Sequence, residues 1–96
     1  MIQQVTIKSA GQEDLKPLVR AAIRGELKLL AHGIKRTRAK LAEFEKRFGM
    51  SSEEFERKFK AIEISETLEN LDWWMELEAL HLLEQQHQTL TEAQID

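Results

Sequence analysis

The sequence predicts a mainly α-helical protein: a long heptad-patterned helix folded against a short helix and an acidic C-terminal helix as a helical hairpin, with one short N-terminal β-strand. Three observations support this fold class. Apolar residues recur with alternating gaps of four and three between residues 23 and 48, which is a heptad seam. A turn signal follows at Gly49, and a wide apolar helical face returns after residue 67. With 96 residues, the chain has room for one domain.

The N-terminal segment, residues 1–8, is predicted to be a short strand. Val5 and Ile7 fall on one side of it, between polar residues. Because no second segment of the chain resembles a strand, its partner is expected in a second copy or in another protein, or else the segment is a disordered tail. The long helix is expected over residues 14–48, with Asp14 as its N-cap and Pro17 in its first turn.

The heptad seam of this helix requires a packing partner. A helix of this length spans roughly 50 Å at ~1.5 Å per residue, which is more than a small domain wraps by itself. Another part of the chain, a second copy or a different protein has to cover the apolar stripe. We assign it to a homodimer interface, with seam residues Ile23, Leu27, Leu30, Ile34, Leu41, Phe44 and Phe48.

A sharp turn and two further helices complete the predicted hairpin. Gly49 suits the left-handed residue that ends a helix. Ser51 and Glu54 form a capping box and Met50 and Phe55 a hydrophobic staple, so a short helix is expected over residues 51–62. A softer break precedes an acidic helix over residues 67–88, whose apolar residues cover more than half of its circumference at the start.

The net charge of −3 conceals two oppositely charged halves. Residues 1–48 contain eleven Lys/Arg and five Asp/Glu (net +6), and residues 49–96 contain three and twelve (net −9), which sum to −3. Such polarity either holds packed antiparallel helices together or serves one acidic and one basic partner. Cysteine is absent, and neither a signal segment nor a membrane-spanning apolar run is present, so we expect a cytoplasmic protein.

Catalysis is poorly supported by the residue types. The chain has no Cys, no Tyr, three His and few loops, so we expect no enzymatic activity and no cofactor. Two Glu-x-x-His spacings, Glu78 to His81 and Glu84 to His87, are typical of di-iron bundles. Both lie on one helix about 120° out of phase, so we expect no metal site.

Two short segments are candidates for macromolecular contact. Four cations within six helical residues would contact phosphates in a dimer, or form a solvated or intramolecularly paired band: Lys35, Arg36, Arg38 and Lys40. On the acidic helix, adjacent tryptophans point about 100° apart, so one is expected to pack on the long helix and the other to offer an aromatic anchor with an acidic rim, unless both are internal. The candidate partner-binding residues are Asp72, Trp73, Trp74, Glu76, Leu77, Glu78 and Leu80.

Two stretches, LAEFEKRFGMSSEEF at residues 41–55 and DWWMELEAL at residues 72–80, resemble small helical proteins encoded beside a ribonuclease-like toxin of the TumE type. The resemblance covers roughly the C-terminal two-thirds of the chain. It implies an antitoxin of a two-gene module, whose acidic helix covers the basic groove of a cognate toxin from a neighbouring gene. Antitoxins of this kind often bind their own promoter as well. A DNA-binding transcriptional regulator and a structural coiled-coil adaptor are the alternatives.

Overall fold

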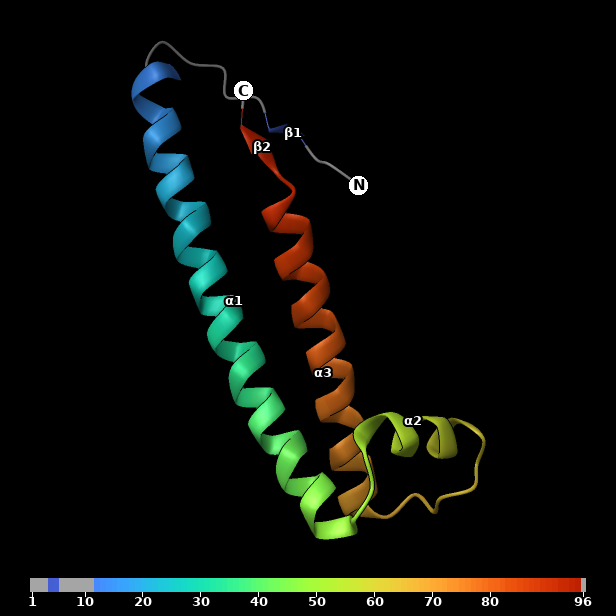
Figure 1. Cartoon of the computed structure of the whole chain (residues 1–96). Coiled ribbons are helices and arrows are strands. Elements are labelled where there is room, and N and C mark those ends of the chain that lie inside the picture. The colour runs from blue at the N-terminus through green and yellow to red at the C-terminus, as the bar shows by residue number, and fades with distance from the viewer. Residues whose placement is uncertain (1–3, 6–11, 96) are drawn as a thin grey trace.

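The computed structural model describes residues 4–5 and 12–95 and is mainly helical. Its helices are α1 (Gln12–Phe48), α2 (Ser52–Lys60) and α3 (Leu68–Thr91). α1 and α3 lie side by side and antiparallel, and α2 projects sideways near the end of the hairpin where the chain turns (Figure 1). The molecule is elongated, with dimensions of 58 × 22 × 18 Å. None of the described helices has both the length and the apolar character needed to cross a membrane.

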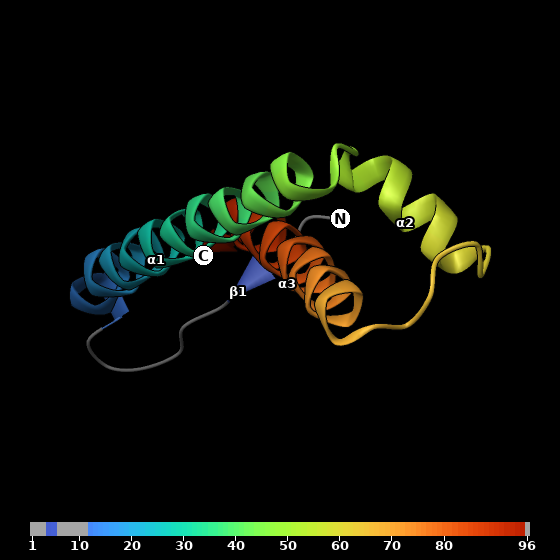
Figure 2. The ribbon, with the colours of Figure 1, turned by 90° about the horizontal axis from the view of Figure 1, so that it is seen from below.

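The core lies where the three helices meet. Figure 2 shows α2 and the loop after it extending to one side of the α1–α3 pair. The buried cluster lies at the end of the hairpin where α2 joins α1. Trp73 of α3 is 1% exposed, and its ring stacks on Phe55 of α2 with centroids 4.0 Å apart. Phe44 and Phe48 of α1 stack on the same indole at 5.6 and 5.5 Å. The buried core residues are Leu41, Phe55, Trp73 and Leu77.

A pair of hydrogen bonds through Ser52 ties the three helices together. The Trp73 Nε1–H donates to Ser52 Oγ over 3.0 Å, and the Ser52 backbone N–H donates to Glu45 Oε2 over 2.8 Å. The backbone N–H groups of the first helical turn have no partner within the helix, and a buried indole N–H also needs an acceptor. Ser52 therefore accepts the indole N–H of α3, and Glu45 of α1 accepts the backbone N–H of Ser52 in α2, so the two bonds connect all three helices.

The predicted helix-start signals are confirmed where they rest on side-chain capping. Ser51 is the N-cap of α2, and its side chain accepts the Glu54 backbone N–H over 3.1 Å. The Glu54 carboxylate pairs with Lys58 at 3.4 Å instead of completing the capping box. Thr67 caps α3 in the same way, accepting the Asn70 backbone N–H over 3.1 Å. The break before the third helix is thus fixed by a threonine cap.

The predicted helix boundaries shift by a few residues. α1 begins at Gln12, so Asp14 lies in its first turn and is not the N-cap. Pro17 consequently lies inside the helix, in the second turn, where its missing N–H removes one backbone hydrogen bond. The short helix ends at Lys60 rather than at residue 62, and the acidic helix extends to Thr91.

The C-terminus of α2 contains a strained residue. The Ile62 N–H donates to the Phe59 carbonyl (3.1 Å) and the Glu63 N–H to the Lys58 carbonyl (2.9 Å), the hydrogen-bond pattern of a Schellman motif. Ile62 occupies its left-handed position with φ of 61°, which is unfavourable for a β-branched residue. Its side chain is 89% exposed, so packing within the chain does not offset the strain.

The heptad seam of α1 is covered by α3 of the same chain. Leu30 and Leu41 are buried, and Leu41 packs in the core with Trp73 and Leu77. Phe48 stacks on Trp73, and the remaining seam residues, Ile23, Leu27, Ile34 and Phe44, are half-buried. Within one chain, α3 thus packs against this seam, and a tethered helix reaches it at a high effective concentration. The seam residues that keep some exposure leave the homodimer a prediction.

The N-terminal strand prediction falls largely outside the described residues. Of residues 1–8, the structure describes β1 (Gln4–Val5), which pairs in parallel with β2 (Gln94–Ile95). Gln4 lies opposite Gln94 and Val5 opposite Ile95. The described part of the strand thus has its partner in the same chain. The sequence did not indicate this pairing, because residues 94–95 continue a polar terminal segment.

Removing the hydroxyl of Ser52 tests the bond to Trp73. Ser52→Ala leaves the buried indole N–H without its acceptor, so we expect the free energy of unfolding to fall by about 1–3 kcal/mol. Urea denaturation followed by circular dichroism measures it. Ser65→Ala, at an exposed serine, is the matched control and should change stability by less than about 0.5 kcal/mol. Equal stability of the two variants would contradict the role given to this bond.

Replacing the strained residue at the end of α2 should stabilise the chain. Glycine adopts a positive φ without steric cost, so we expect Ile62→Gly to raise the free energy of unfolding by about 1 kcal/mol. Gly49→Ala introduces the opposite change at φ of 62° and should lower it by a similar amount. Thermal unfolding of both variants gives the sign directly, and a less stable Ile62→Gly would show that Ile62 makes contacts that its exposure conceals.

Candidate protein-binding surface

The structure distinguishes the two adjacent tryptophans. Trp73 packs against α1, as expected for one of the pair, and is buried. Trp74 is half-buried, its ring stacks on Phe59 of α2 with centroids 5.0 Å apart, and Lys60 Nζ lies 5.8 Å from the ring centroid. Trp73 and the buried Leu77 are core residues that a partner does not reach in this conformation. Trp74 thus contacts Phe59 of α2 and lies near Lys60.

The other residues of the predicted partner surface do not form one patch. Asp72 and Glu76 line a shallow hollow together with Lys40, and Glu76 Oε1 lies 3.5 Å from Lys40 Nζ. Glu78 is exposed. Leu80 is half-buried and lines a different hollow, the one between α1, α2 and α3. The structure therefore divides the predicted surface between the core and separate hollows.

Ion pairs between α1 and α3 neutralise some of the charges of the basic and acidic halves of the chain. Arg38 pairs with Glu84, Lys40 with Glu76 and Arg47 with Glu69, each joining α1 to α3. All six side chains retain solvent exposure, so each pair contributes less than about 1 kcal/mol. Of the predicted nucleic-acid residues, Arg38 and Lys40 are thus engaged by α3. Lys35 and Arg36 are exposed and have no ion pair within the described part of the chain.

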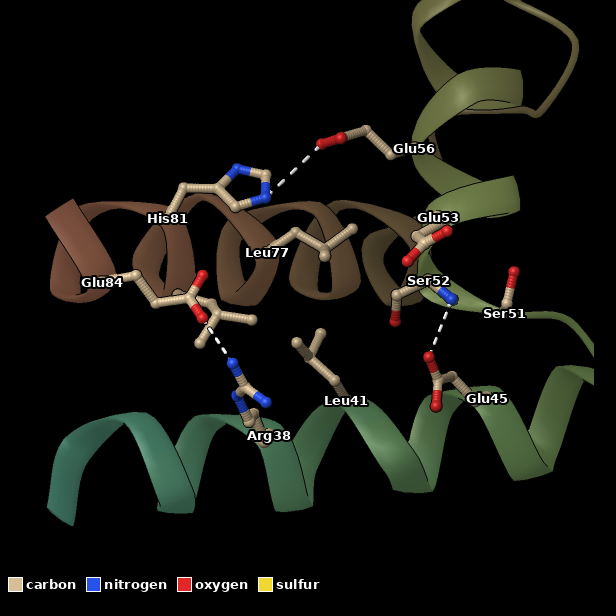
Figure 3. Close-up of a pocket in the computed structure, with 11 residues that line it drawn as sticks. Arg38, Leu41, Glu45, Ser51, Ser52, Glu53, Glu56, Leu77, His81 and Glu84 are labelled. Atoms are coloured by element: carbon tan, nitrogen blue, oxygen red, sulfur yellow. Dashed lines mark hydrogen bonds and ion pairs between the residues drawn. The ribbon is translucent and has the colours of Figure 1, made fainter. Parts of the chain in front are cut away.

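A groove of about 460 Å³ lies between α1, the start of α2 and α3 (Figure 3). This size falls in the range of ligand clefts, roughly 300–1,000 Å³. Its apolar lining comes from Leu41, Leu77 and Leu80, which extend the core to the surface. The polar side chains around this leucine floor are Arg38, Glu45, Ser51, Ser52, Glu53, Glu56, His81 and Glu84.

Negative charge dominates the groove. Four carboxylates and one guanidinium line it, a formal charge of −3 with His81 neutral. Two of the carboxylates are engaged, because Glu84 pairs with Arg38 and Glu45 accepts the Ser52 N–H. Glu53 is exposed and has no ion pair among the described residues. The groove thus offers carboxylate groups that the chain itself does not neutralise.

Glu56 is the least satisfied of these carboxylates. Its Oε2 atom is buried and has no hydrogen-bond partner among the described residues. His81 Nε2 lies 3.8 Å away, beyond hydrogen-bond distance, and Lys60 Nζ lies 4.0 Å from the other oxygen. A buried acceptor without a donor is unfavourable, so this oxygen favours an additional donor.

The sequence did not predict the groove, although it indicated some of its residues. The four-residue spacing of Glu56 and Lys60 on a helix predicts an ion pair, and their charged atoms lie 4.0 Å apart. His81 and Glu84 stand out only for their spacing in metal motifs, and the described residues contain no cluster of three potential metal ligands. The groove exists because α2 turns toward α3, a tertiary arrangement that no local pattern specifies.

Comparison with known proteins identifies no relative. No protein-family model, curated protein or solved structure matches the chain. Its function is therefore inferred from the groove, the charge distribution and the sequence resemblance.

Proposed function

We propose that this protein binds and inhibits a basic protein partner, and that the partner is a ribonuclease-like toxin of the TumE type whose antitoxin this chain is. The carboxylate-lined groove with its leucine floor is the observation that carries the proposal. A ribonuclease holds phosphates with cationic side chains, so an acidic surface that occupies them blocks RNA. Apolar contact in the floor supplies affinity, and the surrounding carboxylates supply complementarity.

Unpaired carboxylates beyond the groove support the same partner chemistry. Within the described residues of α2, α3 and their connecting loop, five exposed acidic side chains have no ion pair: Glu53, Glu63, Glu66, Asp72 and Glu78. They leave this half of the molecule acidic after the cross-helix pairs have formed. Such a field accelerates encounter with a basic partner at low salt and is screened at high salt. We place this encounter in the cytoplasm.

Co-expression with the product of the adjacent open reading frame tests the proposal. We expect a stable complex of defined mass by light scattering, and growth that the toxin alone would arrest. The double variant Asp72→Lys/Glu78→Lys should weaken the complex at least tenfold while its helical content is unchanged, because it reverses two exposed, unpaired charges.

The control variant is Glu26→Lys, which alters an exposed position of α1 remote from α2. It should bind as the unmodified chain does. A neighbour that stays toxic, or that never co-purifies with a folded chain, would overturn the antitoxin proposal.

A DNA-binding regulator is the second candidate function, and one face of α1 favours it. Arg24, Lys28 and Lys35 follow one another at spacings of four and seven residues, which places them on one side of the helix. All three are exposed, and none has an ion pair in the described part of the chain. This cationic stripe spans roughly 16 Å at ~1.5 Å per residue, enough to reach several phosphates.

Salt-dependent binding to duplex DNA tests the cationic stripe. We expect Arg24→Ala/Lys28→Ala/Lys35→Ala to reduce the slope of log K against log salt by about one for each phosphate that the variant no longer binds. Arg38→Ala/Lys40→Ala is the control, since α3 carboxylates already pair these two cations. Absence of salt-dependent binding would eliminate the regulator.

A further inference from the structure

The floor of the groove suits the aliphatic part of a long basic side chain. Leu41 comes from α1 and Leu77 from α3 (Figure 3). Leu80 also belongs to α3 and lines the groove. Long cationic side chains lay their methylene groups along apolar surface while the charged head stays in a polar environment. The groove provides both, because its carboxylates surround the leucine floor.

Two carboxylates of α2 lie at the groove, and neither has a cationic side chain within hydrogen-bond distance among the described residues. Glu53 and Glu56 are three residues apart, so they share one face of the helix, and like charges at this spacing repel each other. The buried Oε2 of Glu56 has no donor within the described residues. A cationic group with several N–H donors would satisfy that oxygen and relieve the repulsion.

From these two observations we propose that the groove is a receptor for one arginine side chain of the partner protein. The arginine stem lies on Leu41, Leu77 and Leu80, and the guanidinium binds the carboxylates of Glu53 and Glu56. This inference rests on the proposed function, since it specifies how the basic partner is anchored. The His81 ring next to Glu56 is half-exposed. The proposed arrangement requires this ring to rotate toward solvent when the guanidinium binds.

Arginine fits the groove better than lysine does. Its planar guanidinium has five N–H donors, which bridge two carboxylates, and it is less strongly hydrated than an ammonium group. The chain's own cations leave the position open. Arg38 is engaged by Glu84, and the amine of Lys60 lies 4.0 Å from the other oxygen of Glu56 with 63% of the side chain exposed.

Titration with a small probe tests the groove without any partner. N-acetyl-arginine amide is added to the full chain, and the backbone amide resonances are followed by NMR. We expect shifts concentrated at residues 51–56 and 77–84. The uncharged analogue N-acetyl-citrulline amide, which has the same shape, should bind at least tenfold more weakly, and the lysine analogue should be intermediate. Equal shifts with citrulline, or shifts spread over all acidic residues, would overturn the inference.

Neutralising the groove carboxylates gives the matched variants. Glu53→Gln/Glu56→Gln should weaken arginine-amide binding at least tenfold. Glu26→Gln/Glu43→Gln, which removes the same charge from exposed positions of α1 outside the groove, should leave it unchanged. If the double groove variant unfolds, Glu53→Gln alone replaces it, because that side chain is exposed and should reduce binding at least threefold. Unchanged binding in a folded groove variant would refute the receptor assignment.

The same variants separate this inference from the proposed function. If the chain captures its neighbouring gene product and Glu53→Gln/Glu56→Gln binds that product with unchanged affinity, the antitoxin proposal stands and the arginine receptor is wrong. If arginine amide occupies the groove while no neighbouring product binds, the receptor stands and the antitoxin proposal is wrong.

Discussion

The hydrogen bond from the Trp73 indole to Ser52 determines the arrangement of the three helices. A buried indole needs an acceptor for its N–H, and the chain provides one at the first residue of α2. Stacking of Phe55 on the same indole then fixes how α2 lies on α3. Because α2 is held there, its first two turns bring Glu53 and Glu56 to the edge of the leucine floor. The acidic groove is thus a geometric result of burying one tryptophan.

The charge distribution has two roles that the fold keeps apart. Pairs such as Arg47–Glu69 cross between α1 and α3, where they favour one antiparallel register over others while adding little stability. The carboxylates that remain unpaired lie on α2, on α3 and in the loop between them, and the unpaired cations of the stripe lie along α1. A single chain therefore presents an acidic and a basic surface without bringing them into contact.

Local signals in the sequence predicted the helices well. The features that depend on how the helices pack against each other were not predictable from those signals. The Ser51 cap and the turn at Gly49 depend on neighbouring residues alone, so they were found. Which tryptophan is buried depends on where α1 lies. Both tryptophans belong to the wide apolar face of the acidic helix, so the sequence pattern does not distinguish them. The heptad seam shows that a helix must be covered, but it does not distinguish α3 from a second copy. Glu56 carries no sequence signal for its role, because its burial arises only when α2 packs on α3.

The position of the core at one end of the hairpin has a further consequence for motion. No residue between positions 14 and 29 of α1 is buried, and neither is any between 78 and 93 of α3 and the residues after it. Local unfolding of the α1–α3 hairpin should begin at the end far from the turn and proceed toward Trp73. Protection of backbone amides from hydrogen exchange should therefore rise along both helices in that direction. The groove lies next to the most protected segment, so this chain can fray at one end and still retain a preformed binding site at the other.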